Sequence, residues 1–113
     1  MKLTIEKEYE YIPAWNDNEK EADPITIKMR ALTEFERDKV ITQRYVEGGL
    51  ETTTNKGEAI RRGVVSIENL FVNNQAVKTA KDLLDTPGVT ALISEIATEV
   101  ILRSAKKDLG NSK

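Results

Sequence analysis

The fold is expected to be built on residues 86–108, TPGVTALISEIATEVILRSAKKD. Thr86 suits the N-cap position of a helix, and Pro87 suits the first helical position because its missing N–H would be unpaired there. Five apolar residues then recur at helical spacing on one broad stripe: Val89, Leu92, Ile93, Ile96 and Val100. An isolated helix of this length is marginal in water, so the stripe predicts a core that packs against it.

The opposite side of the same predicted helix carries a second apolar strip of Ala91, Leu102 and Leu109. Single exposed leucines are common on protein surfaces and need no special cause. Alternatively, the strip contacts another subunit or a partner. Burying both leucines would contribute about 3–5 kcal/mol before the costs of association. We therefore treat these three residues as candidate partner-binding residues.

The composition indicates a single domain with an aliphatic core. The chain has 113 residues, of which 5% are aromatic and 32% are charged. No apolar run is long enough to span a bilayer, and the charged start MKLTIEKEYEY lacks the apolar part of a signal peptide. We therefore expect a cytoplasmic protein.

The chain contains neither cysteine nor histidine, and this limits its chemistry. Disulfides, thiolate metal sites, zinc or haem ligation through histidine, and nucleophilic catalysis through Ser-His or Cys-His pairs are excluded. Carboxylates alone would have to hold any Mg²⁺ or Ca²⁺. The formal net charge of −2 gives no broad field that attracts nucleic acid. We expect no cofactor, no bound metal and no catalytic residue.

Two alternating runs near the start predict an antiparallel β-hairpin within residues 1–32. The first is KLTIEKEYEYI (2–12), with Leu3 and Ile5 on one face, and the second is ITIKMRAL (25–32). In the second run, alternate apolar residues share a face: Ile25, Ile27, Met29 and Ala31.

The polar loop between these runs contains acidic residues at alternate positions, namely Asp17, Glu19, Glu21 and Asp23. Their spacing suggests a calcium loop, but the glycine and the bidentate glutamate of an EF-hand are missing, so a solvated acidic loop is favoured. Trp15 in the same loop has two interpretations. It covers the edge of the sheet, or it is an exposed anchor for a partner.

The middle of the chain is expected to be mostly helical. Thr33 and Glu36 form a capping box, and the helix that follows is predicted to end at Gly48-Gly49, before a flexible loop GGLETTTNKG (48–57). Residues 58–67 are interpreted as helix, although a strand also fits. Asn73-Asn74 predicts a tight turn in a short hairpin, 69–78, and Thr79 with Asp82 forms a second capping box.

The expected fold class is therefore α+β and mainly α-helical. An N-terminal β-hairpin and a second short hairpin would pack on three to four helices, with a long C-terminal helix. Residues 1–113 would form a single domain, in which 1–32 is a hairpin arm and 33–113 is a helical core that includes the short hairpin 69–78.

Three segments carry a resemblance to a known group of proteins: EYIPAWN (10–16), ITIKMRALTEFER (25–37) and IENLFVNNQAVKTAKDLLDTPG (67–88). Followed by a long C-terminal helix, they resemble small proteins from the tail-assembly region of long-tailed bacteriophages and prophages, described as tail assembly chaperone-like. The resemblance implies a protein that binds the tape-measure protein and helps tail-tube subunits to gather around it in the bacterial host cytoplasm. It supplies no residue-level binding motif.

We therefore expect a non-enzymatic tail morphogenesis protein that acts through protein–protein contacts, with a tape-measure or tail-tube protein as partner or with self-association into a homo-oligomer. The candidate contact residues are Trp15, Ala91, Leu102 and Leu109. One alternative is another virion structural or head–tail joining protein.

Two further alternatives rest on charged residues. A nucleic-acid-binding prophage regulator would use a basic patch made of Arg61, Arg62, Lys78 and Lys81. An enzyme would use the carboxylates of Glu95 and Glu99, one helical turn apart, although such pairs usually face solvent.

Overall fold

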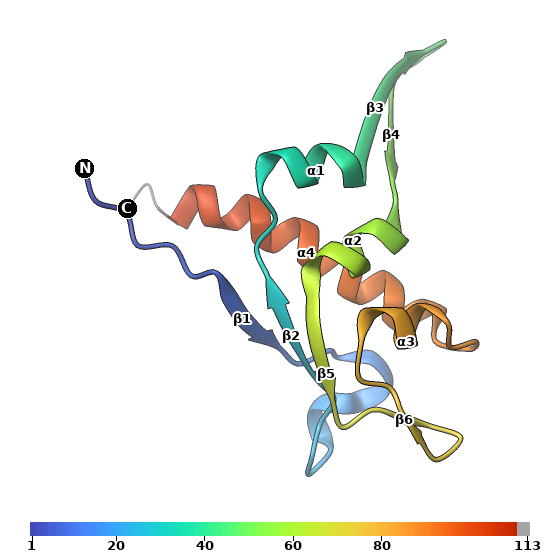
Figure 1. Ribbon diagram of the computed structural model, residues 1–113. Helices are drawn as coiled ribbons and strands as arrows, with labels where there is room; N and C mark the ends of the chain where they lie inside the picture. Colours follow the sequence, from blue (N-terminus) through green and yellow to red (C-terminus); the bar gives the residue numbers. More distant parts are fainter. Residues whose placement is uncertain (111–113) are drawn as a thin grey trace.

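The computed structural model describes the backbone of residues 1–110 and the side chains of residues 1–104 (Figure 1). Helices and strands are interspersed along this part of the chain. In order they are β1 (Glu8–Tyr11), the 3-10 helix η1 (Trp15–Lys20), β2 (Thr26–Arg30), α1 (Glu34–Val40), β3 (Ile41–Val46), β4 (Gly49–Thr54), α2 (Lys56–Gly63), β5 (Val64–Glu68), β6 (Phe71–Val72), β7 (Gln75–Ala76), α3 (Ala80–Leu84) and α4 (Thr90–Gly110).

A three-stranded antiparallel sheet in the order β1-β2-β5 forms one side of the core. Tyr9 pairs with Met29, and Ile27 pairs with Ile67, so these four side chains share the buried face. The predicted antiparallel pairing of the two N-terminal runs is confirmed. The sheet does not extend to residues 1–7, which precede β1 and have exposed side chains.

The long helix α4 packs against the sheet and α2 through its predicted stripe. Val89, Leu92, Ile96 and Val100 are buried, and Ile93 is half-buried, which confirms this face. A Cβ atom added to Gly63 of α2 would lie 2.6 Å from Cγ1 of Val100. Glycine at this position therefore lets the two helices approach closely.

Polar contacts also join α4 to the N-terminal strands. The guanidinium of Arg103 lies over the ring of Tyr9, 4.2 Å from its centroid. The buried hydroxyl of Ser104 accepts a hydrogen bond from the Leu32 N–H at 3.0 Å and donates to the Val100 carbonyl at 3.0 Å. The N-terminal hairpin and the C-terminal helix thus belong to one core.

The predicted start of the long helix at Thr86 is wrong, because α4 begins at Thr90. Thr86 instead closes α3: its hydroxyl donates to the Asp82 carbonyl at 2.7 Å, and its N–H donates to the Leu83 carbonyl. Proline disfavours helical geometry in the residue before it, and Gly88 adopts φ +86°, so the chain turns here before helix α4 begins.

The predicted long helix from Thr33 to Gly48-Gly49 is also wrong. The capping box of Thr33 and Glu36 is confirmed, but α1 ends at Val40, and the next residues form strands β3 and β4. Alternating β-branched and aromatic residues favour extended backbone, and the glycine pair turns a hairpin instead of ending a helix. The loop expected at 48–57 is largely strand β4.

The expected class, α+β and mainly α-helical, is therefore wrong. The structure is mixed, with three small sheets alongside the helices in the described residues. Residues 58–67, expected to be helix, are divided between α2 and β5, and Ile67 pairs with Ile27 in the sheet. Sheet pairing of β5 with β2 overrides the helical spacing of its apolar residues.

Asn18 organises the acidic loop between β1 and β2. Its buried amide donates to the carbonyls of Pro13 and Ile25, and its side-chain oxygen accepts the Ile25 N–H at 2.7 Å. The four acidic side chains expected to be solvated are exposed. The loop is therefore held in shape by one buried asparagine while its charges face water.

The short hairpin around Asn73-Asn74 is confirmed as β6 and β7, with both asparagines at positive φ. The second capping box is confirmed as well. Thr79 accepts the Asp82 N–H at 3.1 Å, and Asp82 accepts the Thr79 N–H at 3.3 Å. Local turn and cap chemistry was sufficient to predict these features.

Candidate interaction surface

One hairpin extends away from the core. It consists of β3, β4 and their turn, residues 41–54, and is called the projecting hairpin below (Figure 1). The strands pair antiparallel over six residue pairs. The turn consists of Glu47 and Gly48; Gly48 has φ +96°, and Gly49, the first residue of β4, has φ +137°, where L side chains are strained. The glycines therefore let the chain reverse within a two-residue turn.

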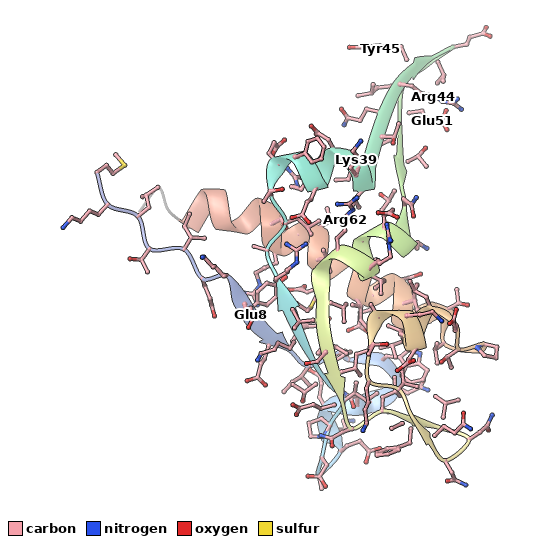
Figure 2. The ribbon with its side chains drawn as sticks, viewed as in Figure 1. Glu8, Lys39, Arg44, Tyr45, Glu51 and Arg62 are labelled. Carbon is pink, nitrogen blue, oxygen red and sulfur yellow. The ribbon has the colours of Figure 1, made fainter. Side chains whose placement is uncertain are left out.

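Neither face of the projecting hairpin is covered. Tyr45 is 90% exposed and pairs with Leu50, which is 54% exposed. Figure 2 shows Tyr45 extending sideways from the hairpin, near its tip. At the base, the Asn55 N–H donates to the Val40 carbonyl at 2.7 Å and ties the two strand ends together. Towards its tip, the hairpin therefore carries one apolar pair of side chains, Tyr45 and Leu50, that is exposed to solvent.

The other face of the projecting hairpin is charged. Arg44 pairs with Glu51 across the strands, with 3.2 Å between Nη2 and Oε2 (Figure 2). Both side chains are largely exposed, so the ion pair contributes at most about 1 kcal/mol to folding. The hairpin thus offers two different faces to a partner.

A cleft of about 470 Å³ lies where the projecting hairpin leaves α1. Its walls are formed by Glu34, Arg37, Asp38, Ile41, Thr42 and Gln43. On the same helix, Phe35 is 68% exposed, and the Lys39 ammonium lies 5.1 Å from its ring centroid. A contact surface can therefore continue from the hairpin onto α1.

The four predicted partner-binding residues lie on two elements. Trp15 begins η1 and packs half-buried against the core, while Ala91 and Leu102 are exposed on α4, Leu102 to 47%. The side chain of Leu109 lies outside the described residues. The partner role of these four residues stays a prediction, and the projecting hairpin is a separate surface.

Three of the four cations in the basic patch expected of a nucleic-acid-binding protein, Arg61, Arg62 and Lys81, have acidic partners. Arg61 donates to Glu58 at 2.7 Å, and Arg62 donates to the same carboxylate at 2.8 Å. These hydrogen bonds lower the pKa of Glu58. Lys81 pairs with Asp85 at 3.0 Å. These cations already have acidic partners, which weakens their attraction for phosphate.

Glu95 and Glu99 have contacts that hold the fold together. The Tyr11 hydroxyl donates to Glu95 at 2.5 Å, and the Ala14 N–H donates to the same oxygen at 2.7 Å. Burial and this hydrogen bond raise the pKa of Tyr11. Glu99 pairs with Arg103 at 3.7 Å. Glu95 thus fixes β1 and its following loop to α4, whereas the pair of Glu99 and Arg103 lies within α4.

Within residues whose placement is described, no group of three or more acidic side chains is arranged to hold a metal ion. In the same part of the chain, each helix is too short or too polar to cross a bilayer.

The sequence contained a signal for the projecting hairpin that the helical interpretation missed. Residues 41–46, ITQRYV, and 49–54, GLETTT, both favour strands, and glycine lies in the turn between them. Because the capping box at Thr33 predicts a helix, the prediction extended that helix as far as these glycines.

Comparison of the chain with protein-family models, curated proteins and solved structures finds no match.

Proposed function

We propose that this protein is a non-enzymatic phage or prophage tail morphogenesis protein, of the tail assembly chaperone type, that acts through protein–protein contacts. The observation that carries the protein-contact role is the projecting hairpin, which extends away from the core (Figure 1) and exposes Tyr45 and Leu50. The phage setting, with a tape-measure or tail-tube protein as partner, rests on the sequence resemblance.

The physical argument concerns stability. A two-stranded hairpin is marginally stable in water unless a third strand or another element packs against it. The projecting hairpin has polar or charged residues on much of both faces and contributes little to the core. A partner that covers Tyr45 and Leu50 or adds a strand would supply the missing burial. The hairpin is therefore suited to binding.

A virion structural or head–tail joining role would use the same surface and stays the second candidate. The nucleic-acid role gains no support from the geometry, because Arg61 and Arg62 are paired with acidic residues.

The test is co-expression with the tape-measure and tail-tube proteins of the same genome, followed by affinity capture. A Tyr45→Ser/Leu50→Ser variant is expected to lose at least tenfold in captured partner. Phe71→Ser is the matched control, since Phe71 is a similarly exposed aromatic residue, 66% exposed, on β6. Leu102→Glu tests the strip on α4 separately.

Full capture by the Tyr45→Ser/Leu50→Ser variant would remove the projecting hairpin from the proposal. If the wild-type chain captures neither protein, the tail-assembly role itself is contradicted.

A further inference from the structure

Residues 1–7, called the leading segment below, have the alternating pattern of a strand but are not part of the sheet. Leu3 and Ile5 alternate with polar residues and are 61% and 47% exposed. The segment joins the body at Lys7, whose carbonyl accepts the Ala31 N–H at 3.3 Å. Before that point its apolar side chains lie outside the core.

We propose that the leading segment of one copy adds as an antiparallel strand to the open edge of β3 in a second copy, with Leu3 beside Tyr45. This inference rests on the proposed function in one respect, namely that the projecting hairpin is the contact surface. It adds a second copy of this chain, joined head to tail, as a partner of that surface.

The edge of β3 is available for a third strand. Among the described residues, β3 pairs with β4 along one edge, and its other edge has no strand partner. With Leu3 beside Tyr45, the two-residue periodicity of strands places Ile5 on the same face. A third strand with apolar residues on one face is what a marginal hairpin needs for stability.

The charges of the two segments are complementary. The leading segment has two lysines and one glutamate, a net charge of +1, whereas the projecting hairpin has Glu47, Glu51 and Arg44, a net charge of −1. The proposed register brings Lys2 close to the turn that contains Glu47. Pairing of the hairpin with the edge of β1 is less favourable, because β1 contains Glu8 and Glu10 and the hairpin is itself acidic.

The contact has to form between copies. Figure 1 shows the leading segment and the tip of the projecting hairpin on opposite sides of the protein. A donor on one side and an acceptor on the other form a heterologous interface, which closes into a ring or continues as a filament. Each copy would thus give one strand and receive another.

Light scattering on two variants and their mixture tests this arrangement. Leu3→Asp/Ile5→Asp removes the donor, and Tyr45→Asp/Leu50→Asp removes the acceptor. Wild type is expected to form oligomers, whereas each variant alone is expected to have the mass of a single chain. Their mixture is expected to give dimers, because the first variant keeps its acceptor and the second keeps its donor.

Three results would overturn the proposal: a monomeric wild type, oligomers formed by the Leu3→Asp/Ile5→Asp variant alone, or a mixture that stays monomeric. Oligomers of the Leu3→Asp/Ile5→Asp variant, which has lost the donor, would instead indicate a symmetric contact between two hairpins. Because the substituted side chains are exposed, unchanged circular dichroism of each variant is the expected control for folding.

Cysteine cross-linking tests the register independently, since the chain has no cysteine of its own. Residues opposite each other on neighbouring strands have Cβ atoms about 4.5–5.5 Å apart, close to what a disulfide needs. A mixture of Leu3→Cys and Tyr45→Cys chains should give a mixed dimer under mild oxidation. Thr4→Cys, which faces the other way, should give at least fivefold less with Tyr45→Cys, and equal yields would contradict the register.

The two proposals fail in different ways. A wild-type chain that captures a tail protein but does not self-associate would overturn only the head-to-tail inference. Self-association that depends on Leu3 and Tyr45, without capture of a tail protein, would overturn only the tail-assembly role.

Discussion

The β1–β2 hairpin and the projecting hairpin are both antiparallel, but their surroundings differ. Tyr9, Ile27 and Met29 of the first are buried against α4, α2 and β5. Tyr45 and Leu50 of the second face water. The backbone pairing is similar in the two, so hydrogen bonds do not explain why one is part of the core and the other extends from it.

The difference shows what each hairpin contributes. Apolar burial is the main stabilising term in folding, and the β1–β2 hairpin provides it within a single chain. The projecting hairpin leaves its apolar residues for another molecule. A residue on the first hairpin should therefore affect stability, and a residue on the second should affect association.

The largest expected effect is on the buried hairpin. Ile27→Ala should lower the free energy of unfolding by about 2–5 kcal/mol, because Ile27 is fully buried and the sheet cannot close over the cavity. Urea denaturation followed by circular dichroism measures it. A loss of less than 1 kcal/mol would show that the β1–β2 hairpin is not part of the stabilising core.

A smaller loss in the free energy of unfolding is expected where α2 crosses α4. Gly63→Ala places a methyl group 2.6 Å from Cγ1 of Val100, and overpacking of this kind costs about 1–3 kcal/mol, more than the gain in helix propensity. The same denaturation experiment applies. Val100→Ala in the Gly63→Ala background should be less harmful than the sum of the two single changes, and strict additivity would contradict the close approach.

A loss of folding stability in acid is expected at α1, the helix from which the projecting hairpin emerges. Glu36 of α1 accepts hydrogen bonds from both terminal nitrogens of Arg30, one of them at 3.0 Å, and these lower its pKa from 4.5 to about 2. Because the pKa is lowered in the folded state, the stabilisation is present above pH 4.5 and is lost as the pH falls towards 2.

Glu36→Gln should therefore cost about 1–2 kcal/mol at neutral pH and weaken the pH dependence of stability between pH 4.5 and 2. Urea midpoints measured across this range provide the test. An unchanged pH profile in the variant would show that other carboxylates control acid unfolding.

The smallest effect on stability is expected in the projecting hairpin. Tyr45→Ser should change the free energy of unfolding by less than about 0.5 kcal/mol, as is usual for exposed side chains, while weakening association. Denaturation at a low protein concentration isolates the monomer. A cost above 1 kcal/mol there would mean that the hairpin packs on its own chain and would remove the contrast between the two hairpins.

Part of the architecture was predictable because its causes are local. The capping boxes at Thr33 and Thr79, the Asn73-Asn74 turn and the apolar stripe of α4 depend on residues within a few positions of one another. The pairing of β1 with β2 was also predictable, since both runs alternate apolar and polar residues and a polar loop separates them. These are the features that sequence patterns describe well.

The candidate surface was predicted less well. The sequence drew attention to Trp15 and to the strip of Ala91 and Leu102, but it treated the projecting hairpin as the end of a helix and a loop. Exposure of Tyr45 cannot be deduced from its residue type, because aromatic residues occur both in cores and at contacts. What covers a strand depends on distant parts of the chain.

The sequence by itself determined the aliphatic core, the capped helices, the N-terminal strand pair and the lack of cysteine and histidine chemistry. Only the tertiary structure decided that residues 64–68 join the sheet, that α4 begins at Thr90 and that residues 41–54 extend into solvent. The first group depends on local spacing and composition. The second depends on which long-range partners are available, because the same apolar pattern forms a strand or a helix according to what packs against it.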